Sequence, residues 1–256
     1  MLPAFARRLP FVSKALFGDR VKFGQVPFPN DPDWAEWNSD SVYAHFYNDT
    51  QRSGVGKIVN DAGYRIHRET RLTGKTVLEI GPGTLEHLSF ANGIPEKYLV
   101  IDVNQDFLDI ATAKLTKSGI PTEAIITSRD TITLPLPTAS VDTIISFYSL
   151  EHLHPLGLHL DEMERVLKPG GELVGAIPAE GGLAWGLGRY LTSRRWLRRN
   201  TTIDPGKIIC WEHVNFADQI ISALKDRFEL DFLAHWPLRL PSPDVNLVTS
   251  FVARRT

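Results

Sequence analysis

The sequence predicts a doubly wound α/β fold. A short apolar run over 77–80, interrupted only by Glu79, leads into the turn Gly81-Pro82-Gly83. A helix-like segment then leads to a second apolar run that ends at Asp102. A strand, a glycine turn, a helix and a strand closed by a carboxylate are typical of the nucleotide-binding half of such folds. Glycine suits the turn because it has no side chain to obstruct the reversal of the backbone, and it lets a ligand approach the main chain closely.

Asp102 indicates the kind of ligand. It lies 23 residues after Glu79, at the end of the second predicted strand, where a carboxylate can accept hydrogen bonds from both hydroxyls of a ribose. Glu86 stands where the third glycine of a dinucleotide fingerprint would be, and its carboxylate disfavours a pyrophosphate beside the start of the helix. We therefore expect a nucleoside without phosphates, and a nicotinamide-dependent oxidoreductase is disfavoured.

The remaining elements follow from apolar runs and helical periodicity. A helix is predicted over 105–117, and Lys168-Pro169-Gly170-Gly171 is expected to end another, since glycine suits a left-handed cap and lysine the negative end of the helix dipole. The sequence places further strands at 124–127, 141–147 and 172–177, and two more apolar runs follow at 228–233 and 245–253.

Several segments resemble the class I S-adenosylmethionine-dependent methyltransferases. Glu79-Ile80-Gly81-Pro82-Gly83 resembles motif I of that superfamily, with Leu85 in place of the third family glycine. S-R-D-T-I-T-L-P at 128–135 and the run from S-F-Y-S-L-E-H-L to K-P-G-G-E-L over 146–173 are also similar to it. The resemblance implies S-adenosyl-L-methionine as cofactor and S-adenosyl-L-homocysteine as product. It further implies a Rossmann-like, seven-stranded sheet, mostly parallel with an antiparallel last strand, and a helical N-terminal cap.

The resemblance also implies where the cofactor binds. Asp130 would accept a hydrogen bond from the adenine amino group and the N–H of Thr131 would contact the ring, although Arg129 stands where the family often has glycine. Asp130 could instead cap a turn. The predicted cofactor-binding residues are Glu79, Gly81, Pro82, Gly83, Asp102, Val103, Asp130, Thr131, Ser146 and Phe147.

The predicted domains are an N-terminal arm and helical cap over 1–72 and a methyltransferase domain over 73–256, with a substrate-side insertion at about 179–215. The basic and apolar residues of 1–32 could form an amphipathic helix on a membrane surface, or a mobile arm or strap packed on the domain. Tyr43 and Tyr47 could face the sulfonium or the substrate, or could bury their helix against the sheet.

The insertion concentrates positive charge. Five arginines fall within eleven positions, and no acid lies between Glu180 and Asp204. Guanidinium groups bind phosphate or carboxylate bidentately, so an anionic substrate is expected. A solvated helix face or a patch on an anionic membrane are the alternatives. The predicted substrate-binding residues are Tyr43, Tyr47, Glu180, Arg189, Arg194 and Arg195.

Methyl transfer to a hydroxyl needs a base with a pKa near neutral, and histidine is the usual choice. His152, which follows the fourth predicted strand, and His213, in the insertion, are the catalytic candidates; His154, Glu151 and Glu180 compete with them. His152 could instead touch the cofactor without taking a proton. No ligand spacing supports a metal site.

The net charge, the cysteine count and the lengths of the apolar runs limit the possible partners. A net charge of -2 gives no whole-molecule field that favours nucleic acid, and Cys210, the single cysteine, excludes an internal disulfide. No apolar run approaches the roughly 20 residues that span a bilayer, and the first residues lack the apolar core of a secretion signal. These features favour a cytoplasmic enzyme.

The expected reaction is methylation of a small molecule, most simply a hydroxyl of a sugar or an anionic saccharide in polysaccharide or natural-product biosynthesis. Methylation of a nitrogen or of a lipid-type acceptor is an alternative. An alternative of another class is a non-catalytic subunit that binds S-adenosyl-L-methionine and serves in interactions. The sequence alone leaves the oligomeric state open.

Overall fold

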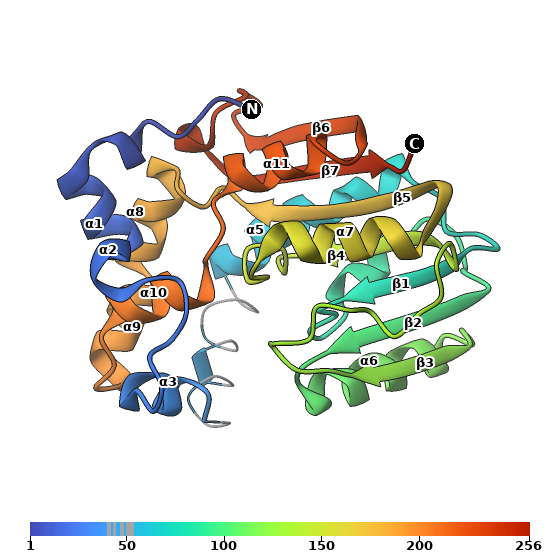
Figure 1. Ribbon diagram of the computed structural model, residues 1–256, viewed down its shortest axis with the longest axis horizontal. Coiled ribbons are helices and arrows are strands. Elements are labelled where there is room, and N and C mark those ends of the chain that lie inside the picture. Colours follow the sequence, from blue (N-terminus) through green and yellow to red (C-terminus); the bar gives the residue numbers. More distant parts are fainter. Residues whose placement is uncertain (40–41, 43–44, 47–48, 50–53) are drawn as a thin grey trace. The chain divides into compact units, whose positions relative to one another are not determined.

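The computed structural model describes residues 1–256 except 40, 41, 43, 44, 47, 48 and 50–53 (Figure 1). The chain divides into two compact units. The first unit comprises 1–62, 178–219 and 235–249; the second comprises 63–177, 220–234 and 250–256. The first unit therefore combines most of the predicted N-terminal cap with the predicted insertion.

A seven-stranded sheet is built around the second unit. Its order is β3-β2-β1-β4-β5-β7-β6, and β7 is antiparallel. The strands are β1 (Thr76–Ile80), β2 (Lys97–Asp102), β3 (Thr122–Ile126), β4 (Val141–Phe147), β5 (Leu167–Pro178), β6 (Glu229–Pro237) and β7 (Asn246–Arg254). The first five pair in parallel, which confirms the predicted mostly parallel sheet with an antiparallel last strand.

Apolar periodicity explains the helices that belong wholly to the second unit. In α6 (Gln105–Lys117), Leu108, Ala111 and Leu115 are buried on one face, and the Asn104 side chain caps the first turn. The other helices are η2 (Arg65–Glu69), η3 (Glu86–Phe90) and α7 (Leu156–Val166). Two helices cross the boundary between units in the sequence: α5 (Gly54–Tyr64) and α11 (Ala217–Lys225).

Two local predictions for the second unit are wrong. The segment after the glycine turn forms only the short 3₁₀ helix η3, because Leu85 takes a left-handed conformation just before it. Gly170 and Gly171 lie within β5 and do not end α7. The reason is pairing: the N–H of Gly170 donates to Arg255 O, and the N–H of Arg255 donates to Gly171 O.

The first unit is mainly helical. Its helices are η1 (Ala6–Arg8), α1 (Pro10–Phe17), α2 (Arg20–Phe23), α3 (Pro32–Trp37), α8 (Leu183–Leu191), α9 (Ser193–Asn200), α10 (Pro205–Glu212) and η4 (Pro243–Val245). Helix α1 packs on α8, and α8 packs on α9. Gly186 permits the first contact, since a Cβ there would lie 2.8 Å from the Phe17 ring.

Long-range hydrogen bonds hold the beginning of the chain within the first unit. The Asp244 carboxylate accepts from the N–H groups of Phe5, at 2.6 Å, and Ala6, at 3.2 Å. The Asp218 carboxylate pairs with Arg7. Residues 1–8 are thus attached to partners more than 200 positions away, as a strap rather than a mobile arm.

Candidate functional site

The glycine turn after β1 is held tightly in the second unit. Gly81 has a φ of +71°, and its N–H donates to Ile101 O at 2.9 Å. The Ser149 hydroxyl donates to Ile80 O at 2.8 Å, and a Cβ on Gly81 would lie 2.9 Å from the Cβ of Ser149. Only glycine meets both conditions, the positive φ and the close approach.

Leu85 stands where the resembling family has its third glycine, and its φ of +54° keeps a glycine-like backbone. Such a conformation costs a non-glycine residue about 1–2 kcal/mol. The side chain is only 2% exposed, and burial of a leucine contributes about 1.5–3 kcal/mol. Burial therefore offsets the backbone cost, which explains how the turn tolerates the substitution.

Asp102 ends β2, next to the turn in the sheet. Its Oδ1 accepts from the N–H of Asn104 at 2.8 Å. Burial raises the pKa of this carboxyl to about 6, with Glu79 adding to the effect, against the lowering from the N–H groups of Asn104 and Val103. At neutral pH the carboxylate is ionised and half-buried, which suits it to accept hydrogen bonds from ribose hydroxyls.

The other predicted cofactor residues differ in exposure. Val103, Asp130 and Thr131 are exposed, and the Thr131 hydroxyl lies 2.9 Å from that of Ser128 in a turn after β3. Ser146 and Phe147, at the end of β4, have buried side chains. The Phe147 ring packs 4.7 Å from the ring of His87, so a cofactor contact from Phe147 would come from its main chain.

Glu79 is fully buried beneath the turn. Tyr98 Oη donates to its Oε2 at 2.6 Å, and His87 Nε2 lies 2.7 Å from its Oε1. Both carboxylate oxygens of Glu79 therefore have protein partners, and they tie η3, which carries His87, and β2 to the strand that enters the glycine turn.

A second histidine extends this buried network. His67 Nε2 lies 2.9 Å from His87 Nδ1, and the rings are stacked. Burial, together with His87, lowers the pKa of His67 to about 3, so His67 is neutral. In this tautomer His67 Nε2–H donates to His87 Nδ1. The other nitrogen, His67 Nδ1, has no hydrogen-bond partner. It carries a lone pair and no hydrogen, and this costs less to bury than an unpaired N–H.

His152 belongs to the turn after β4, in the second unit. Its N–H donates to Ser149 O at 3.0 Å, and its side chain is one-third exposed, with Nε2 3.8 Å from Oε1 of the buried Glu151. The fold thus places His152 after the carboxyl end of a strand, on the same unit as Asp102. Strand ends of this kind carry the ligands in doubly wound sheets.

The first unit holds a second group of polar residues around Glu180, which has no exposed surface. Arg189 binds it bidentately, with Nη1–Oε2 at 2.7 Å and Nη2–Oε1 at 2.8 Å. Trp185 Nε1 donates to Oε2 at 2.9 Å, and His213 Nδ1 lies 3.0 Å from the same oxygen. Although burial opposes ionisation, Arg189 and His213 bring the pKa of Glu180 down to about 2. Glu180 is thus a fixed carboxylate.

Glu180 Oε2, 3.0 Å from His213 Nδ1, favours a proton on that nitrogen. Nε2 is then the basic nitrogen of the neutral ring. Arg20 fixes the local backbone by donating to His213 O at 2.5 Å and Val214 O at 3.0 Å. A carboxylate that orients a histidine is a recurrent arrangement for a general base.

The arginines of the predicted clamp differ in their partners and exposure. Arg189 points inward and is neutralised by Glu180. Arg194 donates to Ala15 O and lies 5.4 Å from the Tyr190 ring, whereas Arg195 is exposed. Arg189 and Arg194 thus both reach the last turn of α1, through Leu16 O and Ala15 O. Tyr43 and Tyr47 lie outside the described residues.

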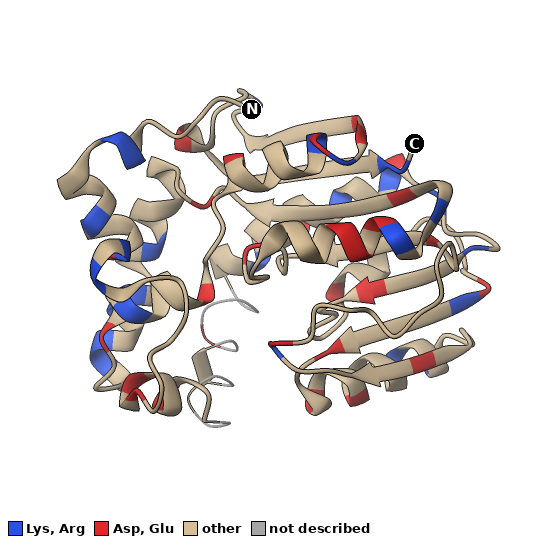
Figure 2. Ribbon diagram, viewed as in Figure 1, with Lys and Arg blue, Asp and Glu red and all other residues tan. Residues whose placement is uncertain are grey.

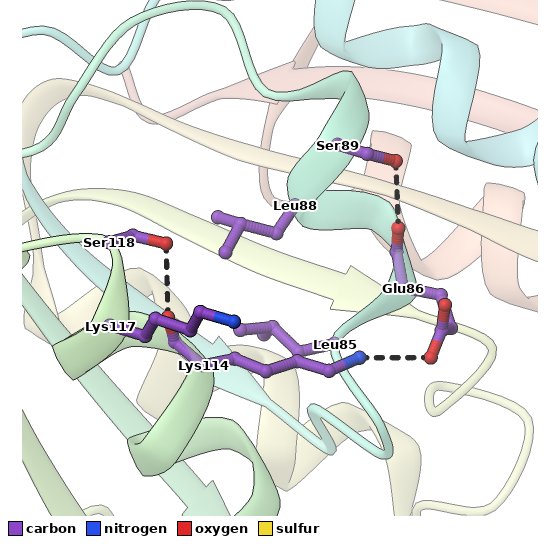
Figure 3. Close-up of a pocket in the computed structure, with 7 residues that line it drawn as sticks. All are labelled: Leu85, Glu86, Leu88, Ser89, Lys114, Lys117 and Ser118. Atoms are coloured by element: carbon purple, nitrogen blue, oxygen red, sulfur yellow. Dashed lines mark hydrogen bonds and ion pairs between the residues drawn. The ribbon is translucent and has the colours of Figure 1, made fainter.

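Figure 3 shows a hollow between η3 and α6 in the second unit. Lys114 crosses one side of it, bound to Glu86 Oε1 at 2.9 Å and to Thr84 O at 2.6 Å. The lining residues are Leu85, Glu86, Leu88, Ser89, Lys114, Lys117 and Ser118. None of these was predicted to bind the cofactor, and the hollow lies on the helix side of the turn.

The described part of the chain lacks two other kinds of feature. No group of three or more His, Cys, Asp or Glu side chains is arranged to hold a metal ion. No described helix has the length and apolar content required to cross a membrane.

Sequence reasoning missed the partners of Glu79. Tyr98 was counted only as part of an apolar strand, and His67 and His87 lie in 3₁₀ segments without periodicity. No sequence signal singled out these residues.

The sheet order, the glycine turn and Asp102 define a Rossmann-like methyltransferase fold. Residues 78–175 match the family described as "Methyltransferase domain". Over this stretch the chain is similar to class I S-adenosylmethionine-dependent methyltransferases, whose methyl donor is S-adenosyl-L-methionine.

The curated relatives include two ubiquinone/menaquinone biosynthesis C-methyltransferases named UbiE. The protein of Saccharophagus degradans is 29% identical over 50% of this chain and 51% of its own length. That of Cellvibrio japonicus is 29% identical over 59% and 62%. The chain thus spans between half and two thirds of the length of these relatives.

Solved structures share the fold at lower identity. A SAM-dependent methyltransferase from Aquifex aeolicus matches with a TM-score of 0.53 at 18% identity, covering 83% of this chain and 98% of that one. The [4+2]-cyclase SpnF matches with a TM-score of 0.55 at 15% identity, covering 100% and 97%. At these identities the likeness concerns the fold alone, and one fold can carry different reactions.

Proposed function

We propose that this protein transfers the methyl group of S-adenosyl-L-methionine to a small-molecule acceptor. The observation that carries the proposal is the glycine turn after β1 beside the half-buried carboxylate of Asp102, in a domain that matches the methyltransferase family. Gly81 and Gly83 give the turn its positive φ angles, and a carboxylate in the position of Asp102 can accept the hydroxyls of a ribose. These residues fit the adenosine part of the cofactor, which supplies a methyl group already activated on a sulfonium.

We propose a hydroxylated aromatic ring as the acceptor. The UbiE relatives are named as C-methyltransferases of ubiquinone/menaquinone biosynthesis, and removal of a proton from a ring hydroxyl makes both the oxygen and the neighbouring ring carbons nucleophilic. The anionic character of the expected saccharide depended on the arginines of the insertion, and Arg189 is already neutralised by Glu180. An aromatic acceptor needs no such clamp.

For the base we propose His213, held by Glu180. The hydroxyl proton of the acceptor passes to Nε2, and the acceptor then takes the methyl group as the bond from that carbon to sulfur breaks, leaving S-adenosyl-L-homocysteine. Glu180 keeps Nδ1–H in place and stabilises the imidazolium that forms. A general base of this kind contributes about 10²–10⁴-fold to a rate. His152 is the alternative base.

Two measurements test the proposal in order. Calorimetry with S-adenosyl-L-homocysteine should show binding that Asp102→Asn weakens. Tritium transfer from labelled S-adenosyl-L-methionine should then favour phenols over sugar nucleotides, amines and RNA. Binding without transfer to any acceptor would identify a non-catalytic binding subunit, and transfer to amines alone would identify an N-methyltransferase.

The base is identified by comparing His213→Gln with His152→Gln. We expect His213→Gln to lower kcat/KM by about a hundredfold or more and to remove the acid limb of its pH profile, while S-adenosyl-L-homocysteine affinity stays unchanged. If His152→Gln has that effect instead, the base belongs to the turn after β4.

A further inference from the structure

Helix α8 of the first unit has its polarity reversed. Its buried face carries Gly186 and the ion-paired Arg189, whereas large apolar side chains face outward. The exposed residues are Leu183, Leu187, Tyr190 and Leu191. At 100° per residue they fall within an arc of about 100°. A surface helix in water normally shows the opposite pattern, so this stripe is built to meet something less polar than water.

Positive charge borders the apolar stripe. Helix α9 begins two residues after Leu191 and turns Arg195, Arg198 and Arg199 outward, with Leu197 buried on the opposite face. The guanidinium of Arg198 lies 6.0 Å from the Tyr190 ring of the stripe. The basic face of α9 and the apolar stripe of α8 are therefore neighbours in space.

Helix α1, which packs on α8, repeats the combination. Phe11 is 90% exposed, and the exposed Arg8 and Lys14 stand three residues before and after it. Figure 2 shows Lys and Arg recurring along α1, α2 and α9 of the first unit. Although the whole chain has a net charge of -2, this group of helices is strongly positive.

We propose that the outer faces of α1, α8 and α9 dock on an anionic lipid bilayer surface. Exposed leucine and phenylalanine side chains would enter the boundary between headgroups and acyl chains, while the arginines pair with lipid phosphates, as amphipathic interfacial helices do. Charge complementarity favours this occupant over a second copy of the chain, since two copies would oppose like charges at the same face. Docking goes beyond the proposed function and places it at a surface where acceptors with long apolar tails dissolve.

The test is co-sedimentation of the full chain with vesicles of phosphatidylcholine alone and of phosphatidylcholine with 30% phosphatidylglycerol. We expect binding to the anionic vesicles that falls steeply in 1 M salt, where the Debye length shrinks to about 3 Å. Leu191→Ser should lower the partition coefficient about tenfold. The matched control is Ile94→Ser: Ile94 is 67% exposed and Leu191 is 65% exposed, but Ile94 lies in the second unit, so its variant should bind like the wild type.

Charge is tested in the same way. The triple variant Arg195→Gln, Arg198→Gln and Arg199→Gln should bind about a hundredfold more weakly, whereas Arg68→Gln, at an exposed position of the second unit, should not. Equal effects of Leu191→Ser and Ile94→Ser, or no binding by the wild type, would overturn the proposal. So would a dimer in sedimentation velocity that Leu191→Ser dissociates without any vesicle binding. None of these readouts uses the cofactor, so their failure is separate from a failure of methyl transfer.

Discussion

Replacing Asp102 by asparagine should make the protein more stable and its cofactor site weaker. The carboxyl has an ordinary pKa of 3.8 and a folded-state pKa of about 6, mainly because of burial. The folded state thus holds this proton more tightly than the unfolded state. At pH 8 both states are ionised, and the shift corresponds to a cost of about 2–3 kcal/mol in the folded protein.

Because the pKa of Asp102 is raised in the folded state, the free energy of unfolding depends on pH in a defined direction. Acidification from pH 6 to pH 4 protonates Asp102 in the folded state first, so the cost disappears over that window. The asparagine side chain of the variant carries no charge and keeps an oxygen to accept from the N–H of Asn104. We therefore expect Asp102→Asn to raise the free energy of unfolding by about 2 kcal/mol at pH 8, and by an amount approaching zero at pH 4.

Urea unfolding without cofactor, at pH 8 and pH 4, measures both values. Calorimetry should show S-adenosyl-L-homocysteine binding about ten- to a hundredfold more weakly to the variant, since hydrogen bonds to a charged group are lost. The matched control is Asp142→Asn: burial is opposed there by Lys168 and the N–H of Thr76, which lower the pKa of Asp142 overall, so that variant should be less stable at pH 8. A variant Asp102→Asn no more stable than the wild type at pH 8 would refute the reasoning.

Three further substitutions test the buried polar groups and one close contact, all by urea unfolding. Glu180→Gln should cost about 3–5 kcal/mol, because the guanidinium of Arg189 stays buried without its counter-charge. Gly63→Ala should cost about 1–3 kcal/mol, since a Cβ would lie 2.2 Å from the Tyr148 hydroxyl. The pKa of His67 is lowered to about 3, so stability should fall as the pH drops below 6.5, and His67→Phe should flatten that fall.

A different result would contradict each of these three predictions. If Glu180→Gln lowers the free energy of unfolding by less than about 1 kcal/mol, the ion pair between Glu180 and Arg189 is exposed to solvent. An unchanged Gly63→Ala would mean that the Tyr148 ring moves aside at no cost. An unaltered acid slope in His67→Phe would assign the acid sensitivity to other groups.

The strands were predictable because each parallel strand contains a short apolar run, and the glycine turn because a positive φ with a close neighbour admits only glycine. Asp102 followed from its place at the end of such a run. These signals are local in sequence, so they survive without knowledge of the tertiary structure.

The directions of the arginines were not predictable. Counting charge between Glu180 and Asp204 could not show that Arg189 turns inward to Glu180 while Arg195 turns outward, because that depends on how α8 packs on α1. The histidine pair under the turn was equally hidden, since His67 and His87 meet only once η2 and η3 are folded.

The strap formed by the first residues has a consequence for biosynthesis. Phe5 and Ala6 find their partner only at Asp244, near the end of the chain. At a synthesis rate of about 5–20 residues per second, the N-terminal helices wait roughly 10–50 seconds for that partner. During this interval Phe17, which is fully buried in the folded protein, has no completed core to enter. The emerging chain therefore cannot bury Phe17 in its final surroundings until Phe216, whose ring it contacts, has been made.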